Sequence, residues 1–527
     1  MDLNPSLLTT LVDGLEALET APYSDTATVL SRMLANLNAY LVLDNLDVDT
    51  PQMAASLSEL IGEGIGQLLS GQNIDGGWSW WGGSINGSQA SDPFITAYVL
   101  LGLTAADEAG MEIGEDFIVR ARNYLVFELP QPGEVESAWM LDRTVFMAYA
   151  LRGDDGSLAP TFDGLYARRT ELSPWALGLL ALAMHDTAGM NARVTTLVSD
   201  LEGRAIRSAT GVHWENARFS WMLPGTPVYN TAVAVYALAQ LDPASASLPL
   251  ALRYLMAHQG ADKLWSTGFE SAWVLMAVAK AAQGTGDYQA DFEFQATLNG
   301  VLIAEGLAAG PELLNTVSAS TAIDSLVPDG PNALVIHRGE GAGTLYYRVD
   351  LNTYQPAADA EPIQRGITLN RAYYFSGEEC PADEACPPID SIKLDPDDPG
   401  QFITVELTVN LAQDMYHLLV EDFIPAGTEI LNRGLLTSQT LPQADFGWFD
   451  PCDPFANGWG WWLFNAPQIY DDHILWTAGY VPAGTYLLTY ELLPYQRGAY
   501  QVLPAHTWQY FYPEVQGTTA GDVFLIE

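Results

Sequence analysis

The segment SDPFITAYVLLGL (91–103) follows the loop DGGWSWWGG (75–83), and this pairing of an aromatic loop with an apolar helical segment decides the fold class. The same order returns at ARFSWMLPG (217–225) before YNTAVAVYALAQL (229–241), and again within KLWSTGFESAWVLMAVAKA (263–281). Helical pairs that recur roughly every 40 to 60 residues are typical of a solenoid or of a closed ring. We therefore expect a repeating architecture of paired helices.

Apolar residues outside these segments also follow a helical period from about residue 5 to residue 284. Leu177, Leu180, Ala181 and Met184, for example, lie at positions i, i+3, i+4 and i+7. This pattern predicts about twelve helices. Glycine or proline marks the expected helix ends at Gly71, Gly110, Gly189, Pro243 and Gly284. Neither end of the region is a polar cap, which favours a closed α/α toroid over an open solenoid.

The apolar period changes to two after residue 288. Val405, Leu407, Val409 and Leu411 alternate with polar residues, and the segment around Tyr486 repeats the alternation. Turns with proline and glycine separate such runs, which is typical of antiparallel β-sandwiches. The segment PAADAEP (356–362) resembles a linker between two β regions. The predicted fold class is therefore an α/α toroid followed by antiparallel β-sandwich domains.

The composition restricts the partners of the chain. Its 527 residues include 65 acidic and 21 basic side chains, which gives a formal net charge of −44. Nucleic acids and anionic membrane surfaces would repel such a chain, so we expect neither as a partner. No segment has the apolar length of a membrane span, and the start MDLNPSLLTTL does not resemble a signal peptide. Cys380 and Cys386 could form a disulfide in an exported protein, which would leave Cys452 over.

Several motifs together resemble the C-terminal part of bacterial alpha-2-macroglobulins, which are relatives of the complement thioester proteins. SWWGGSINGSQASDPFITAYVLLGL (79–103) is similar to the signature of the family's ring domain, and WSTGFESAW (265–273) is similar to a stretch near the ring's end. DMYHLLVEDFIPAGTEILN (414–432) and RGAYQVLPAHTWQYFYPEVQGTTAG (497–521) resemble the family's terminal macroglobulin-like domain. The order of these motifs along the chain is more specific than any one of them.

The resemblance implies three domains. Residues 1–287 resemble the thioester-type α/α toroid domain, and residues 288–355 resemble the second half of a CUB-like β domain into which the ring is inserted. Residues 363–527 resemble the terminal macroglobulin-like β-sandwich domain. The family's upstream macroglobulin domains, with the bait region that proteases cut, have no counterpart here. We therefore expect the chain to be a fragment or a split gene product.

The bond-forming residues of the family's thioester are missing from the matching stretch APYSDTATVLSRMLANL (21–37). Thioester-bearing members carry a cysteine and a glutamine three residues apart, whose sulfur and side-chain carbonyl form the bond. Alignment on the family's serine–arginine pair places Asp25 at the cysteine and Thr28 at the glutamine. No cysteine precedes Cys380, so a shifted alignment restores nothing. The chain thus resembles the thioester-lacking branch, and Ser24 or Asp25 is predicted to cap the following helix.

The function implied by the resemblance is non-enzymatic inhibition of proteases by conformational trapping, outside the cell, in the periplasm or at the cell envelope. The partners would be proteases, reached through the full-length parent, and the upstream domains. We expect no catalytic residue, cofactor or metal site. Five residues resemble the part of the terminal domain that faces the ring: Met415, Tyr416, Tyr510, Phe511 and Tyr512. The alternative is a stand-alone interaction or structural module without inhibitor activity.

Other patterns have a structural interpretation. QNIDGGW (72–78) matches a motif of terpene cyclases, which also use α/α barrels, but these enzymes need acidic residues inside the barrel. The acidic segment at 395–400 lies in the β half, where we interpret it as a turn. His185 and His213 are predicted to be satisfied or surface histidines. The stretch WGWWLF (459–464) is an aromatic loop whose role stays open.

Overall fold

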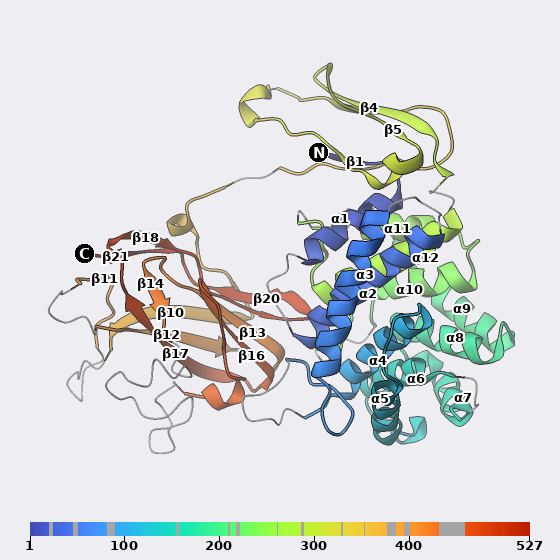
Figure 1. Cartoon of the computed structure of the whole chain (residues 1–527), viewed down its shortest axis with the longest axis horizontal. Helices are drawn as coiled ribbons and strands as arrows, with labels where there is room; N and C mark the ends of the chain where they lie inside the picture. Colours follow the sequence, from blue (N-terminus) through green and yellow to red (C-terminus); the bar gives the residue numbers. More distant parts are fainter. Residues whose placement is uncertain are drawn as a thin grey trace. The chain divides into compact units, whose positions relative to one another are not determined.

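The computed structural model comprises two compact units, Met1–Gly83 with Ser88–Leu351, and Asn352–Glu527 (Figure 1). The described residues are 1–19, 25–45, 51–81, 90–153, 157–208, 211–217, 222–260, 262–285, 289–327, 330–351, 354–376, 386–394, 401–431 and 459–527. The acidic segment 395–400 lies outside these residues, as do Cys380 and Cys452. Cys386 is disulfide-bonded.

Twelve α-helices form most of the first unit, within the ranges just given. They are α1 (Leu7–Glu19), α2 (Thr26–Asn45), α3 (Pro51–Ser70), α4 (Pro93–Glu108), α5 (Glu115–Glu128), α6 (Ala138–Leu151), α7 (Ala159–Ala167), α8 (Pro174–Ala188), α9 (Ala192–Glu202), α10 (Pro227–Leu241), α11 (Leu248–Ala257) and α12 (Gly268–Thr285). Helices α3, α4, α8, α10 and α12 end within one or two residues of the predicted glycine and proline signals. The helix pattern of the sequence is therefore confirmed.

The even-numbered helices form a closed inner ring. Along the chain, α2 packs on α4, α4 on α6, α6 on α8, α8 on α10 and α10 on α12, and α12 then packs on α2. The helices α5, α7, α9 and α11 each pack against the two inner helices that adjoin them in sequence, and α3 packs on α2. This closure confirms the predicted α/α toroid.

Local sequence explains where several inner helices begin. Asp92, Ser173 and Thr226 are the N-cap residues of α4, α8 and α10, and a proline follows each of them. The cap side chain accepts backbone N–H groups of the first turn, and proline suits the first helical position because it has no N–H to satisfy. Residues 174–184 of α8 are all buried, so this helix is enclosed on every side.

Aromatic side chains fill the middle of the ring. Phe94 of α4 stacks on Phe146 of α6, with ring centroids 4.6 Å apart. Trp175 of α8 and Tyr229 of α10 lie 5.7 Å apart, and Tyr229 lies 5.9 Å from Trp273 of α12. These five rings are at most 2 % exposed. A packed aromatic cluster thus occupies the place where a barrel enzyme would need an acidic cavity.

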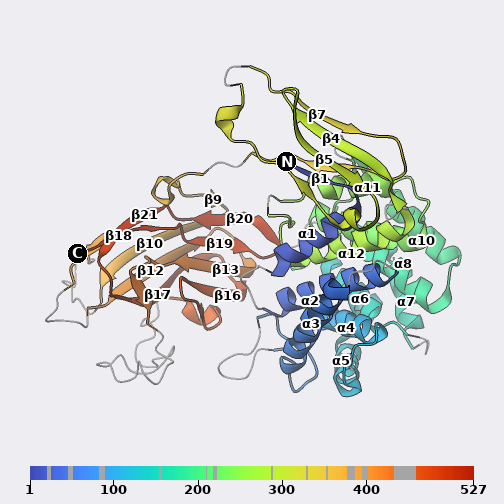
Figure 2. The ribbon, with the colours of Figure 1, turned by 45° about the horizontal axis from the view of Figure 1, so that its top comes forward.

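A small β region completes the first unit. Its strands are β1 (Asp2–Asn4), β4 (Phe292–Leu298), β5 (Val301–Ala308), β6 (Val317–Ser318), β7 (Leu334–Arg338) and β8 (Tyr346–Arg348). β1 lies between β6 and β8, with Leu3 opposite both Val317 and Tyr347. The pairing joins residues that precede the ring to residues that follow it, and Figure 2 shows β1 among these later strands. Leu3 shares a core with Phe292 and Phe294.

The second unit is a β-sandwich. One sheet has the order β10-β12-β17-β14 and the other the order β15-β16-β13-β19-β20-β9, and β11-β21-β18 form a smaller sheet. The strands are β9 (Gln364–Arg365), β10 (Ile367–Phe375), β11 (Ser391–Ile392), β12 (Ile403–Leu411), β13 (Met415–Phe423), β14 (Thr428–Ile430), β15 (Gln468–Ile469), β16 (His473–Val481), β17 (Gly484–Pro494), β18 (Gly498–Val502), β19 (His506–Gln509), β20 (Tyr512–Thr518) and β21 (Asp522–Ile526).

The predicted alternation explains the core of this sandwich. Val405, Leu407 and Val409 of β12 are fully buried, while the residues between them are partly exposed. β12 pairs with β17 in antiparallel register, so that Leu407 lies opposite Leu488. The antiparallel β-sandwich expected from the period-two pattern is confirmed.

Candidate functional site

The start of α2 holds the two residues that align with the family's thioester pair. Asp25 directly precedes this helix, and Thr28 lies in its first turn. The Thr28 backbone N–H donates to Asp25 Oδ1 at 2.9 Å, and the Thr28 hydroxyl donates to Asp25 Oδ2 at 2.5 Å. Both residues are 4 % exposed. Asp25 is therefore the helix cap that the sequence predicts, whereas Ser24 lies outside the described residues.

The aromatic loop that precedes α4 supports this helix start. The Thr26 backbone N–H donates to the Trp80 carbonyl oxygen at 3.0 Å. In the same loop, Trp78 Nε1 donates to the Leu68 carbonyl oxygen at the end of α3, at 2.7 Å. The loop thus connects the end of an outer helix to the beginning of an inner one.

The electrostatics of Asp25 are those of a buried acceptor. Burial raises the pKa of its carboxyl group, while the hydrogen bonds from Thr28 act in the opposite direction. Thr28 donates its hydroxyl to this carboxylate and is itself enclosed. The described residues hold no cluster of histidine, cysteine or acidic side chains that could bind a metal ion. The arrangement can stabilise a helix terminus, and it contains neither the thiol nor the carboxamide of a thioester.

His185 and His213 have local partners. His213 of the short strand β3 (Gly211–His213) lies with Nε2 3.0 Å from Glu215 Oε1 and stacks on Tyr254 at 4.6 Å. His185, in the last turn of α8, lies 3.5 Å from Asp186. His185 is partly exposed, as predicted, whereas His213 is buried with Nδ1 lacking a hydrogen-bond partner among the described residues.

The residues predicted to face the ring lie at two adjoining places in the sandwich. Tyr416 follows the first residue of β13, and its ring lies 4.9 Å from that of Tyr480. Tyr510 and Phe511 form the turn between β19 and β20, and the Tyr510 N–H donates to the His417 carbonyl oxygen at 2.9 Å. The sandwich therefore brings residues 416–417 and 510–511 together.

Met415 and Tyr512 have different surroundings. Met415 is fully buried and belongs to the hydrophobic core of the sandwich. Tyr512 begins β20 and is 2 % exposed. A docking role for Tyr416, Tyr510, Phe511 and Tyr512 stays a prediction, while Met415 has a core position that accounts for its burial.

A repeated hydrogen-bond pattern was missed by the sequence reasoning. Trp214 Nε1 donates to the Leu201 carbonyl oxygen at 2.7 Å, as Trp78 Nε1 does to Leu68. Trp265 makes the same bond to Leu255 at 2.8 Å. In all three cases the tryptophan's backbone N–H donates to a hydroxyl on the next inner helix.

The predicted aromatic cluster 217–225 precedes α10, but the tryptophan of this hydrogen-bond repeat lies just before that cluster. Trp221 lies outside the described residues, and Trp214 occupies the repeated position. The available signal was a tryptophan 10 to 13 positions after the leucine that accepts its bond, since 78 − 68 = 10, 214 − 201 = 13 and 265 − 255 = 10. That spacing reflects the turn from an outer helix to the next inner helix.

A second set of residues that the sequence did not predict links the two sheets of the sandwich. Arg371 of β10 donates to Asp422 Oδ1 of β13 at 2.7 Å, and both side chains are almost completely buried. Tyr490 of β17 donates its hydroxyl to Asp422 Oδ2 at 2.8 Å. Asp422 belongs to the stretch quoted for the family resemblance, but nothing in its spacing indicated a partner 51 residues earlier.

The features above define a class of protein with a closed α/α toroid, a small β region joined to it, and a terminal β-sandwich. Residues 366–514 match the family model described as the bacterial alpha-2-macroglobulin MG10 domain. The match confirms the resemblance to bacterial alpha-2-macroglobulins for the terminal sandwich.

Curated relatives extend the similarity beyond the sandwich. The chain is 21 % identical to the alpha-2-macroglobulin homolog of Yersinia pestis over 474 residues, which covers 86 % of the chain and 22 % of the relative. It is 22 % identical to the alpha-2-macroglobulin homolog of Nostoc, over 88 % of the chain and 23 % of the relative. The chain therefore spans less than a quarter of the length of these relatives.

Solved structures share the fold. Native alpha-2-macroglobulin from Escherichia coli, in a structure spanning domain MG7 to the C-terminus, matches with a TM-score of 0.67 and 17 % identity. The match covers the whole chain and 76 % of that structure. Salmonella alpha-2-macroglobulin reacted with methylamine matches with a TM-score of 0.66 and 17 % identity, over the whole chain and 31 % of that protein.

Proposed function

We propose that the chain is the C-terminal part of a bacterial alpha-2-macroglobulin-like protease inhibitor that acts by non-covalent conformational trapping. In this mechanism a protease cuts a bait region in the upstream domains of the parent, the domains rearrange, and the protease is enclosed. The present chain would contribute the toroid and the terminal sandwich. Similarity to curated alpha-2-macroglobulin homologs over most of the chain supports the proposal.

The non-covalent part of the proposal rests on the two residues at the thioester position, Asp25 and Thr28. A thioester needs a thiol and a carboxamide, and Asp25 and Thr28 supply a carboxylate and a hydroxyl. These groups satisfy each other at the start of α2, where they are enclosed. Because this position has no acyl donor, a protease would be held by non-covalent contacts alone.

The proposed place of action is outside the cell, in the periplasm or at the cell envelope, because that is where an inhibitor meets foreign proteases. None of the described helices is long and apolar enough to cross a membrane. The proposed partners are proteases and the upstream macroglobulin domains of the parent. We propose no enzymatic activity, which is supported by the aromatic filling of the ring and by the structural contacts of His185 and His213.

A stand-alone interaction or structural module is the second candidate. Its support is that each unit has its own core: the aromatic cluster in the ring, and a large cluster of buried apolar residues in the sandwich. An upstream reading frame that encodes macroglobulin domains would favour the inhibitor. A promoter directly before the codon for Met1, without such a neighbour, would favour the module.

The experiment for the inhibitor uses the full-length parent and a protease of broad specificity. After incubation, the protease is assayed with a short chromogenic peptide and with a large protein substrate. We expect cleavage of the peptide to continue and cleavage of the protein substrate to fall, because an enclosed protease admits only small molecules. The same protease without the parent is the matched control, since nothing then limits its access to either substrate.

Two further measurements test the absence of a covalent step. Methylamine should leave the mass of the parent unchanged, and the complex with the protease should separate completely in denaturing electrophoresis. Uptake of methylamine by this chain would contradict the non-covalent mechanism. Equal cleavage of small and large substrates, with and without the parent, would contradict the inhibitor proposal as a whole.

A further inference from the structure

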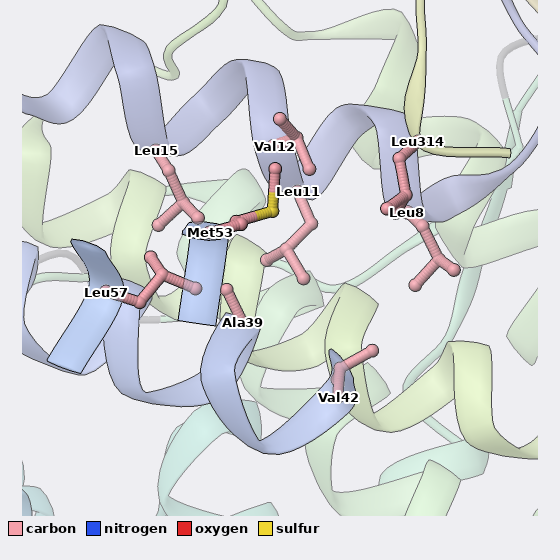
Figure 3. A pocket seen from close by; sticks show the side chains of 9 residues that line it. All are labelled: Leu8, Leu11, Val12, Leu15, Ala39, Val42, Met53, Leu57 and Leu314. Carbon is pink, nitrogen blue, oxygen red and sulfur yellow. The ribbon is translucent and has the colours of Figure 1, made fainter. Parts of the chain in front are cut away.

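An apolar cavity lies between the first three helices of the ring and the β region. Its volume is about 130 Å³, and it is lined by nine side chains from α1, α2, α3 and the short 3₁₀ helix η4 (Gly310–Leu314). Figure 3 shows these side chains around the space they enclose. All of the lining elements belong to the first unit.

The lining is hydrocarbon or thioether throughout. Helix α1 contributes Leu8, Leu11, Val12 and Leu15, whose spacing places them on one stripe of the helix. Leu314 of η4 closes one end, so the β region supplies part of the wall. Opposite this stripe, helix α2 presents the small side chain of Ala39, while Val42 of α2 and larger side chains of α3 line the rest of the cavity.

The cavity has an opening between α1 and α3. Val12 and Met53 are only partly buried, whereas the other lining residues are 9 % exposed or less. Figure 3 shows Val12 and Met53 near each other, on facing helices. A small molecule could therefore enter without unfolding of the ring.

The chemistry of the walls restricts the occupant. A buried water needs two to four polar partners, and the lining side chains offer no hydrogen-bond donor or acceptor stronger than the Met53 sulfur. A peptide segment would bring backbone N–H and C=O groups that would remain unsatisfied. Apolar cavities of similar volume, about 150 Å³, stay dry and bind benzene.

We propose that this cavity is a binding site for an uncharged hydrocarbon group of about the size of benzene, such as a small aromatic ring or the last carbons of an acyl chain. The bound group fills the gap beside Ala39 and contacts α1, α2, α3 and η4 at once. Its burial couples the helices of the ring to the β region. The inference rests on the cavity alone and is independent of the proposed inhibitor function.

The experiment titrates the full chain with two probes. Benzene represents a free hydrocarbon, and octanoate below its micelle concentration represents a chain end attached to a polar head. The melting temperature of the first unit and ligand-observed NMR are recorded for the wild type and for Ala39→Leu, which fills the gap. Gly62→Ala is the matched control, because Gly62 lies on α3 and an added Cβ would have no atom within 4 Å apart from its own helix backbone.

Benzene is expected to raise the melting temperature of the wild type and of Gly62→Ala, and to leave that of Ala39→Leu unchanged. If Ala39→Leu does not fold, Val12→Phe at the opening replaces it and should also abolish the shift. Binding of octanoate as well would extend the site to acyl chains, and binding of benzene alone would restrict it to free small molecules. No shift in the wild type, or an equal shift in the filled variant, would overturn the proposal.

Discussion

The ring and the sandwich both bury carboxylates, but they satisfy them in different ways. In the ring, Asp25 accepts hydrogen bonds from Thr28, and Asp142 of α6 accepts the backbone N–H of Ser173 at 2.9 Å. Both carboxylates therefore lie at the start of an inner helix, α2 or α8. In the sandwich, Asp422 accepts from Arg371, a guanidinium group in the facing sheet.

The difference follows from what each fold supplies. An inner helix presents free N–H groups and a partial positive charge at its N-terminus, which can hold a carboxylate without a cation. A strand in a sandwich has its N–H groups engaged in the sheet, so a buried carboxylate there needs a side-chain partner. The ring should therefore tolerate neutralisation of its carboxylates, and the sandwich should not tolerate loss of either member of its pair.

The largest expected effect is the loss of Asp422. Asp422→Ala leaves the Arg371 guanidinium buried without its counter-charge and removes the acceptor of the Tyr490 hydroxyl. Breaking a buried pair in this way costs about 3–5 kcal/mol of unfolding free energy. Urea denaturation of the sandwich, followed by tryptophan fluorescence, measures the loss.

Two variants make this prediction specific. In Arg371→Met with Asp422→Leu, both charges are replaced by apolar groups, and most of the lost stability should return. Asp414→Ala is the exposed control, since Asp414 is on the surface and accepts hydrogen bonds from Tyr480 and Ala483. If the double variant were as unstable as Asp422→Ala, the cost would come from lost packing instead of an uncompensated charge.

The pair also shows what sequence alone could predict. The alternation in β12 and β17 predicted strands and their buried faces, because the side-chain period of a strand is a local property. The pairing of Arg371 with Asp422 depends on how two sheets stack, and no local pattern encodes it. The pKa shifts show the coupling: burial would lower the pKa of Arg371, but the charge of Asp422 raises it above its usual value.

The ring was predictable for the same local reason. Glycine and proline signals gave the helix ends, and the tryptophan loops gave the repeat. Closure of α12 on α2 was favoured by the lack of polar caps, yet the aromatic cluster that fills the axis could not be derived, because Phe94, Phe146 and Trp175 come from separate helices. The Asp25 cap was predictable because the cap and the bonds it accepts lie within four residues.

The next effect is a pH dependence of the ring's stability that comes from Asp142. Burial raises the pKa of Asp142 to about 7 from 3.8, although the hydrogen bonds from Ser173 and the charge of Arg204 act in the opposite direction. The folded protein therefore keeps a proton that the unfolded chain loses at lower pH. The stability linked to this group is fully present below about pH 4 and is lost as the pH rises to about 7.

Asp142→Asn should remove this dependence, since the amide oxygen still accepts the Ser173 N–H and carries no charge. Relative to the wild type, the free energy of unfolding of the variant should increase by about 3 kcal/mol as the pH rises from 4 to 7. Thermal unfolding across this range measures the difference, with the exposed Glu112→Gln as the control. A difference that did not change with pH would show that Asp142 is ionised in the folded ring throughout the range.

The smallest expected effect is at Asp25. It distinguishes the role of this side chain as a hydrogen-bond acceptor from the role of its negative charge. Asp25→Ala removes the acceptor of two Thr28 groups and should cost about 1 kcal/mol, as the loss of a helix N-cap usually does. Asp25→Asn keeps an oxygen for the Thr28 N–H and removes the buried charge, so its stability should equal or exceed that of the wild type at neutral pH. Denaturant unfolding of both variants provides the comparison. A loss in Asp25→Asn equal to that in Asp25→Ala would mean that the ring needs the negative charge itself at this helix start, as the sandwich needs that of Asp422.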